Sequence, residues 1–385
     1  MVSNFEAALI LSGLSSIGFR RFQSIWNSLE GDLPKLFTLS PSELTGGLRL
    51  PPIAADRVCK WRGFFDLDGQ LAKLESFGAH FVPYFDDSYP ALLKELRYPP
   101  IGIYLAGKPL PTGRTIAIVG TRRCSFRGER TAYEIAKSFA QKGIASVSGL
   151  ALGIDMAAHG GTLAANGHTV AVLGGGLDII YPPGNAGLYK TIRKNGTLVS
   201  EFSFGRPADR HSFAIRNRII TGLANAVLVV ESPADGGSML SAQRAMEQRR
   251  PLFAVPGNPE EPVSEGCRQL IRDGVARPIH SAEELLEALE DSTFEASSPP
   301  AARAKAARTK PPLPKKVAKE KPQLTAAENT VWDRLLEEGP QTADDVAMAT
   351  GLGVLKCAQI LQLFCVRGWA RRELSGAFSL LPSVL

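Results

Sequence analysis

The spacing of apolar positions changes along the chain and divides it into segments. Up to about residue 75, apolar residues such as Phe19, Phe22 and Ile25 recur at helical spacing. A stretch that begins and ends with glycine, residues 13–18, interrupts this pattern. The spacing therefore predicts two helices joined by a short turn within residues 1–75.

Two consecutive helices with a short glycine-containing turn resemble a helix-hairpin-helix or SAM-like unit. A hairpin of this kind can hold a phosphate on its backbone N–H groups. Residues 1–75 carry no other special chemistry, and a plain packing module is an equally open interpretation. We expect a small helical domain in this segment.

Between about residues 80 and 291 short β-branched runs alternate with amphipathic helices. Buried strands without polar alternation, separated by helices, predict a parallel sheet covered on both faces. We therefore expect an α/β fold, a Rossmann-like domain, with its ligand on the loops that follow the carboxyl ends of the strands. The predicted strands are Ile116–Val119, Ile144–Val147, Val170–Leu173, Leu198–Val199, Ala226–Val230 and Leu252–Val255.

Residues 325–385 show the pattern of three helices followed by a hairpin. Thr325 and Glu328 form a capping-box start for the first helix, and Thr342 caps the second. A third helix is expected to close at Arg367, before a β-hairpin. This is the order of a winged-helix domain, although other small helical domains share most of it.

The charge of the chain is concentrated in residues 292–324, which hold eight Lys/Arg, two Glu and six Pro. The whole chain has a net charge of +6, and this segment alone accounts for it. Such a segment cannot bury enough apolar surface to offset its ordering entropy, so we expect a disordered basic linker. Because the rest of the chain is neutral, any binding of a polyanion by the folded body must come from local clusters of charge.

Cysteine usage and hydropathy argue for a protein of the cytoplasm. The five cysteines form no Cys-x-x-Cys pair, which disfavours a disulfide framework and a structural zinc. No run of about 18 apolar residues occurs, and the N-terminus lacks the features of a secretory signal. We expect a soluble cytoplasmic protein with no metal and no membrane contact.

Glycine-rich loops follow four of the predicted strands. Gly120, Gly149, Gly174 and Gly236 each lie just after a strand end. Such turns expose backbone N–H groups beside helix N-termini, which suits a phosphate, although parallel sheets need tight turns in any case. The dinucleotide fingerprint and the P-loop are both absent, so NAD, FAD and ATP are poor candidates.

Two arginine clusters supply the local charge that a polyanion site requires. Residues 121–130 hold four Arg and one Glu, and residues 205–218 hold four Arg and one Asp. Phe213 lies within the second cluster. Arginines with an interleaved aromatic ring are typical of a single-stranded nucleic acid channel. A core position for Phe213 and ordinary salt bridges for the arginines remain the alternative.

A set of short motifs follows in order along the chain. The motifs are Val119–Arg122, Ser148–Asp155, Ala158-His159, Gly176–Asp178, Tyr181-Pro182, Ser200-Glu201, Phe213, Arg216–Arg218, Gly237-Ser238 and Val255–Gly257. This set resembles the DNA-processing protein A family, DprA, also called Smf, and the resemblance is dense over residues 80–290.

The resemblance implies a single-stranded DNA-binding protein of natural transformation that protects incoming strands. Members of this family load the RecA recombinase, displace single-strand-binding protein, form homodimers through the Rossmann-like domain and use no known cofactor. The resemblance places the DNA-binding residues of this chain at Arg122, Gly149, Arg210, Phe213, Arg216, Asn217, Arg218, Gly237 and Ser238.

Two other functions stay open on the sequence. The fold is similar to that of phosphoribohydrolases that cleave nucleoside monophosphates, but Gln243 stands where their catalytic Glu belongs, and a neutral amide is no general acid or base. Asp155 and His159, four residues apart, have no obvious nucleophile beside them. The second possibility is a duplex-DNA regulator, but the third tail helix carries only Lys356 as a charge, which disfavours base reading in a major groove.

Overall fold

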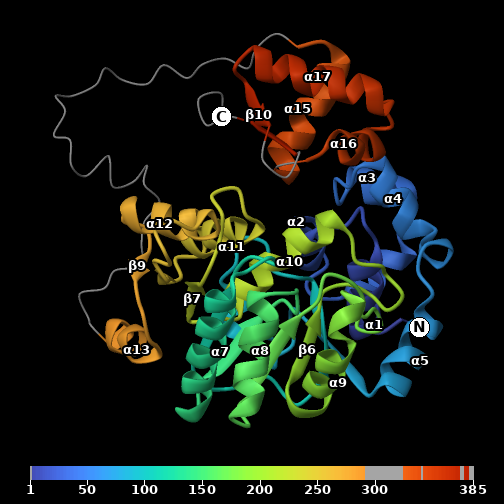
Figure 1. Ribbon diagram of the computed structural model, residues 1–385. Coiled ribbons are helices and arrows are strands. Elements are labelled where there is room, and N and C mark those ends of the chain that lie inside the picture. Colours follow the sequence, from blue (N-terminus) through green and yellow to red (C-terminus); the bar gives the residue numbers. More distant parts are fainter. Residues whose placement is uncertain (1, 291–323, 340, 373–376, 381–385) are drawn as a thin grey trace. The chain divides into compact units, whose positions relative to one another are not determined.

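The computed structural model describes residues 2–290, 324–339, 341–372 and 377–380 (Figure 1). Contacts divide the chain into two compact units, Met1–Ala307 and Arg308–Leu385. The predicted linker, residues 292–324, lies outside the described residues except for its last position. We describe each unit by itself.

The first unit is built on a nine-stranded sheet with the order β1-β2-β6-β5-β4-β3-β7-β8-β9. Strands β3 to β9 pair in parallel where they are neighbours, whereas β2 pairs antiparallel with both β1 and β6. The strands are β1 Ala79–Pro83, β2 Gly102–Gly107, β3 Thr115–Val119, β4 Ala145–Ser148, β5 Thr169–Val172, β6 Thr197–Ser200, β7 Ala226–Val229, β8 Leu252–Ala254 and β9 Arg277–Pro278.

All six predicted strands are present, within one or two residues of their expected ends. The mixed α/β fold with a mainly parallel sheet is therefore confirmed. The sheet is not wholly parallel, because β1 and β2, which the sequence pattern did not indicate, add an antiparallel edge.

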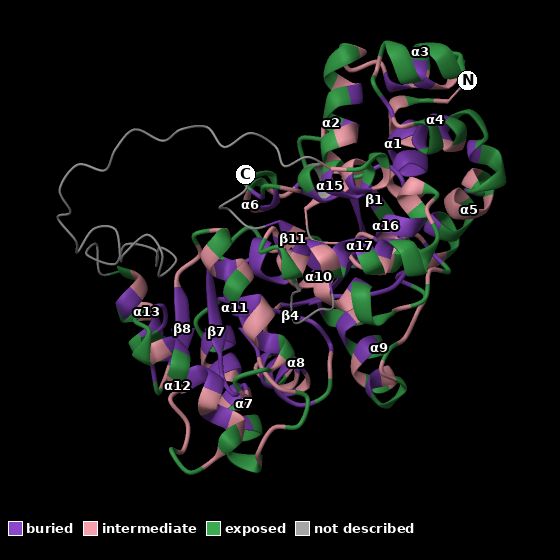
Figure 2. Ribbon diagram, turned by 90° about the horizontal axis from the view of Figure 1, so that it is seen from above, coloured by how far each residue is buried: buried purple, intermediate pink, exposed green. Residues whose placement is uncertain are grey.

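Helices cover both faces of the sheet, and alternate strand residues contact different helices. Ile116 and Ile118 pack in one cluster with residues of α7, α8 and α13. Ala117 and Val119 pack in another with residues of α10, α11 and α12. Figure 2 shows β7 and β8 as buried, whereas the helices beside them carry buried, intermediate and exposed residues. These helices and their companions are α6 Ala91–Lys94, α7 Phe126–Gln141, α8 Ile154–Ala164, α9 Ala186–Asn195, α10 Arg210–Gly222, α11 Gly237–Glu247, α12 Glu265–Arg272 and α13 Ala282–Glu290.

The N-terminal helices pack on the antiparallel edge of the sheet. The ring of Phe5 meets that of Phe81 of β1 edge-on at 5.8 Å, and the Gln70 amide exchanges two hydrogen bonds with the backbone of Phe204. Because the two segments share one core, the predicted domain boundary between residues 75 and 80 stays a prediction. The N-terminal elements are α1 Asn4–Gly13, α2 Phe19–Ser28, η1 Leu33–Thr38, α3 Pro41–Gly46, α4 Pro52–Cys59, η2 Trp61–Gly63 and α5 Leu67–Phe77.

The second unit contains the three helices and the hairpin that its sequence predicts. Thr325 accepts from the N–H of Glu328 and Thr342 from that of Asp345, so both expected capping boxes form. The helices enclose a core of their own around Phe364. The elements are α15 Ala326–Glu338, α16 Ala343–Thr350, α17 Val354–Val366, β10 Ala370–Arg372 and β11 Phe378–Leu380. Their assignment as a winged-helix domain stays a prediction.

Two adjacent glycines of α8 give a matched test of how closely α8 packs against α7. A Cβ on Gly161 would lie 2.1 Å from the backbone oxygen of Tyr133, whereas one on Gly160 would meet only the Tyr133 ring, at 3.7 Å. We expect Gly161→Ala to lower the free energy of unfolding by about 1–3 kcal/mol because backbone must move. Gly160→Ala should raise it by about 0.5–1 kcal/mol through helix propensity. Urea denaturation followed by circular dichroism measures both, and equal effects of the two substitutions would contradict the packing described.

Candidate functional site

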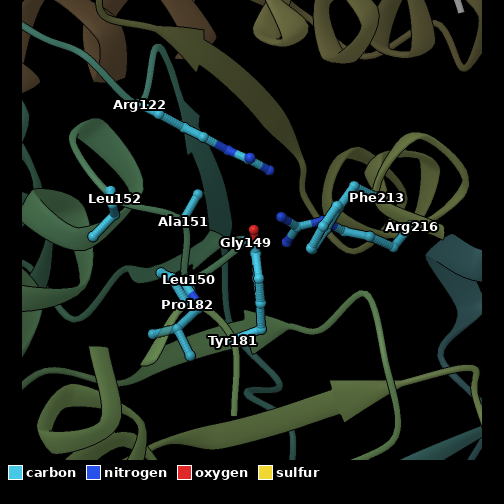
Figure 3. Close-up of a pocket in the computed structure, with 9 residues that line it drawn as sticks. All are labelled: Arg122, Gly149, Leu150, Ala151, Leu152, Tyr181, Pro182, Phe213 and Arg216. Atoms are coloured by element: carbon cyan, nitrogen blue, oxygen red, sulfur yellow. The ribbon is translucent and has the colours of Figure 1, made fainter. Parts of the chain in front are cut away.

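The loops that follow β3, β4 and β5 meet helix α10 at the carboxyl edge of the sheet, and together they line a pocket (Figure 3). This is the edge at which an open parallel sheet binds its ligands. The pocket is lined by Arg122, Gly149, Leu150, Ala151, Leu152, Tyr181, Pro182, Phe213 and Arg216.

A carboxylate beneath the pocket holds the loop after β4. Asp155, in the first turn of α8, accepts the N–H groups of Gly149 at 3.1 Å and Ala151 at 3.4 Å. Burial raises the pKa of Asp155, and the nearby Arg216 guanidinium opposes this effect. Because its acceptor oxygen is engaged by these amides, Asp155 serves to shape the loop.

His159 supports the same loop from one turn further along α8. The N–H of Leu150 donates to Nε2 of His159 at 3.3 Å, so the ring proton is on Nδ1, which donates to Oγ1 of Thr169 at 2.7 Å. His159 is fully buried, and burial, with the positive charge of Arg216, lowers its pKa to about 3. The imidazole is therefore neutral and structural, not a titrating catalytic group.

Arg216 places a buried cation at the floor of the pocket. Its side chain is 4% exposed and donates to the carbonyl of Val172, and its Nε has no hydrogen-bond partner among the described residues. Burial lowers the pKa of Arg216 to about 10, which leaves it charged at neutral pH, and Asp155 favours that charge. A Cβ on Gly149 would lie 1.9 Å from the guanidinium, so glycine is required there to admit Arg216.

Aromatic rings form one wall of the pocket. The Arg122 guanidinium lies 5.0 Å from the centre of the Phe213 ring. The centre of the Tyr181 ring lies 5.1 Å from the centre of the same Phe213 ring. In Figure 3 the Arg122 side chain points toward Phe213 and Arg216. Phe213 is half-buried and Tyr181 is 44% exposed, so both rings can meet a ligand. Two guanidinium groups beside two rings suit a ligand that combines an anion with a flat ring.

The structure thus brings four of the nine predicted site residues into one pocket, namely Arg122, Gly149, Phe213 and Arg216. Arg210 is exposed at the first position of α10 and does not line the pocket. Asn217 is half-buried on the same helix. Arg218 forms an ion pair with Glu201, and both side chains are largely buried. The binding roles of these three residues stay predictions.

Gly237 and Ser238 begin α11, outside the pocket. The Ser238 hydroxyl is buried and donates to Oγ of Ser232 at 2.8 Å. Gly237 is exposed, and a Cβ there would meet nothing within 4 Å. The internal packing of the chain therefore gives no reason for glycine at this position, and its role in binding also stays a prediction.

Tyr181, Leu152 and Pro182 line the pocket although the sequence analysis assigned them no role. The Tyr181-Pro182 pair, joined by a cis peptide bond, belongs to the motifs that carry the family resemblance. Tyr181 could have been identified from the sequence, because it is an aromatic residue in a loop that follows a predicted strand.

Within the part of the chain that the structure describes, no group of three or more His, Cys, Asp or Glu side chains could hold a metal ion. No helix of that part has the length and apolar character needed to cross a membrane.

The geometry defines a mixed α/β protein with a site of cations and aromatic rings at the carboxyl edge of its sheet. The model of the DNA recombination-mediator protein A family matches residues 80–290, more than half of the chain. The chain belongs to this family, as the sequence resemblance predicts.

Curated relatives share a large part of this region. The chain is 41% identical to protein Smf of Synechocystis sp. over 212 residues, which cover 53% of this chain and 52% of that protein. It is 36% identical to DNA processing protein DprA of Bacillus subtilis over 231 residues, which cover 60% of this chain and 77% of the relative. The chain therefore spans only about half of the length of the Synechocystis relative.

Two solved structures have the same fold. DNA processing protein A of Streptococcus pneumoniae superposes with a TM-score of 0.64 and 30% identity, over 74% of this chain and 98% of that chain. The protein of the same name from Helicobacter pylori gives a TM-score of 0.51 and 29% identity, over 57% and 98% of the two chains. The latter structure is described as showing a single-stranded DNA binding mode.

The buried state of His159 predicts an unusual titration. The pKa of His159 is about 3 in the folded chain and about 6.5 in the unfolded chain. Between pH 3 and pH 6.5 this histidine therefore binds more protons in the unfolded chain than in the folded chain. The contribution of His159 to stability is therefore complete above pH 6.5 and declines as the pH falls toward 3. In ¹⁵N NMR spectra its ring should stay neutral, with the proton on Nδ1, from pH 8 to pH 5. A His159 transition near pH 6.5 would contradict the assignment.

Proposed function

We propose that this protein binds single-stranded DNA through the pocket at the carboxyl edge of the sheet. The observation that carries the proposal is the cluster in which Arg122 and Arg216 flank the Phe213 ring, at 5.0 and 5.9 Å from its centre. Membership of the recombination-mediator family and the binding mode described for the Helicobacter pylori relative support it.

The chemistry of the pocket suits one nucleotide of a single strand. Arg122 is exposed and Arg216 lines the pocket, so both can present a guanidinium group to phosphate oxygens. Phe213 and Tyr181 offer ring faces on which a base can stack, and stacking accepts any base. Binding of this kind tracks the backbone and is independent of sequence.

We further propose the cellular role that the family implies: a cytoplasmic recombination mediator that protects incoming DNA and loads RecA during natural transformation, displacing single-strand-binding protein. A homodimer formed through the Rossmann-like domain is part of this proposal. So is the domain order of a helical SAM-like or helix-hairpin-helix unit in residues 1–75, a Rossmann-like domain in 80–291, a basic linker in 292–324 and a winged helix in 325–385.

We propose binding without turnover. Gln243 takes the position of the catalytic Glu of the related phosphoribohydrolases, and its amide donates to Glu247 at 3.0 Å on the exposed side of α11. Asp155 is occupied by two backbone amides below the pocket floor. Neither residue offers the free carboxylate that glycosidic cleavage requires.

The tail has an accessory role in this proposal. Helix α17 carries only Lys356 as a charged side chain, so it offers little positive charge to the phosphates that border a major groove. The body alone supplies the single-strand site.

Replacing both Arg122 and Arg210 by Ala tests the electrostatic part of the proposal. Each arginine that contacts a phosphate contributes about −0.7 to the slope of log affinity against log salt on single strands. The double variant should bind oligo-dT more weakly and with a slope shallower by about 1.4 than the wild type. Fluorescence anisotropy at several salt concentrations measures both quantities.

Arg114→Ala is the matched control, because Arg114 is exposed just before β3, at the opposite edge of the sheet. It removes one positive charge away from the pocket and should leave the affinity and the slope nearly unchanged. Unaltered binding by the Arg122/Arg210 variant would exclude the proposed pocket.

Phe213→Ala tests the stacking part separately. Loss of a ring on which a base stacks should cost about 1–3 kcal/mol of binding free energy while the salt slope stays the same. Phe213→Tyr, which keeps the ring face, should retain most of the affinity. A change of slope without a change of affinity at low salt would show that Phe213 acts on the arginines and not on a base.

A further inference from the structure

Phe126 is an exposed aromatic residue that the packing of the fold does not use. It is 81% exposed and begins α7, whose buried residues are Gly128, Ala132, Ile135, Ala136, Phe139 and Ala140. Phe126 precedes the first residue of this stripe by two positions, about 200° around the helix, so it lies outside the buried face. Arg130, one turn later, shares that exposed side with it.

Arginines lie close to this ring along the chain, on either side of it. Arg123, Arg127 and Arg130 are all exposed, and no ion pair involves them within the described residues. Glu129 is the one acidic residue among positions 121–130, and it is exposed as well. The start of a 16-residue helix adds the positive end of its dipole at the same place.

The segment that carries Phe126 is held firmly by Glu231. This carboxylate, 3% exposed, accepts the N–H of Ser125 at 2.8 Å and its hydroxyl at 2.6 Å, and Ser125 caps α7. Gly128 leaves room for the same carboxylate, because a Cβ there would lie 2.2 Å from it. The backbone of Glu231 also accepts the N–H of Thr121 at 2.7 Å. The ring is therefore presented on a fixed backbone.

The ring is close to the pocket along the chain. Arg122, which lines the pocket, is four residues before Phe126, so their Cα atoms are separated by no more than about 15 Å. A nucleic acid strand bound at Arg122 can therefore extend to Phe126.

We propose that Phe126, with Arg123, Arg127 and Arg130, forms a second stacking platform for single-stranded DNA that leaves the pocket. The arginines bind successive phosphates and the Phe126 ring holds one base, as in other sequence-independent single-strand channels. This inference rests on the proposed function and extends its footprint to the start of α7. A protein partner could also meet an aromatic ring among arginines, but the closeness of Phe126 to the pocket favours the strand.

Binding of dT16 by Phe126→Ala tests the platform. We expect a loss of affinity of about 5- to 150-fold, the equivalent of one stacked base, with an unchanged salt slope. Phe126→Trp should restore binding. The loss should persist in the Phe213→Ala background, since the two rings hold different bases and their effects should add.

Phe64→Ala is the matched control, because Phe64 is 54% exposed and has the Arg57 guanidinium 5.6 Å from its ring centre, in the N-terminal helical segment. It should bind dT16 as the wild type does. The mass of each free protein, measured by light scattering, completes the experiment.

The possible outcomes separate the two proposals. Wild-type affinity in Phe126→Ala, while Phe213→Ala is impaired, would overturn the platform and leave the pocket intact. A changed mass of the free Phe126→Ala protein would overturn it in favour of a protein interface. Failure of the wild type to bind dT16 would refute the proposed function, and the platform with it.

Discussion

The site depends on one buried cation. Removing a guanidinium from water costs several kcal/mol unless the protein returns charge and hydrogen bonds to it. Arg216 receives these from Asp155 and from the carbonyl of Val172, and it fits only because position 149 has no Cβ. The end of β5, the loop after β4 and helix α10 are therefore fixed relative to one another by a single side chain. Arg216 also lines the pocket, so its charge acts on a ligand bound there.

The need to compensate the buried charge of Arg216 also explains the buried polar side chains of α8. A buried histidine and a buried aspartate are unfavourable in a helix that packs against a sheet, yet both engage the backbone of the loop after β4. His159 must be neutral to accept the Leu150 N–H, and the positive charge of Arg216 disfavours a second proton on it. Asp155 balances the charge of Arg216 while it orients Gly149. The loop geometry and the charge of the pocket are thus set together.

The sequence predicted those structural features that depend on residues close together along the chain. The central strands are continuous apolar runs, and the tail helices begin with capping boxes, so both could be found in the sequence. Strands β1 and β2 could not, because their antiparallel pairing is a tertiary feature and β2 begins and ends with glycine. At the site, Arg122, Phe213 and Arg216 could be identified from the arginine clusters. The pairing of Arg218 with Glu201 depends on the packing of α10 beside β6, and the spacing of the two residues does not reveal it.

A body with no net charge can still attract a polyanion if its acidic residues are turned inward at one edge. Glu231 binds Ser125, Asp155 binds backbone amides, and Glu201 pairs with Arg218, each largely buried beside the loops at the carboxyl edge. Arg122, Arg123 and Arg210, which are exposed at the same edge, form no ion pair within the described residues. Neutrality over the whole body therefore coexists with a positive rim, because internal hydrogen bonds and buried pairing withdraw the negative charge from the surface where a strand would bind.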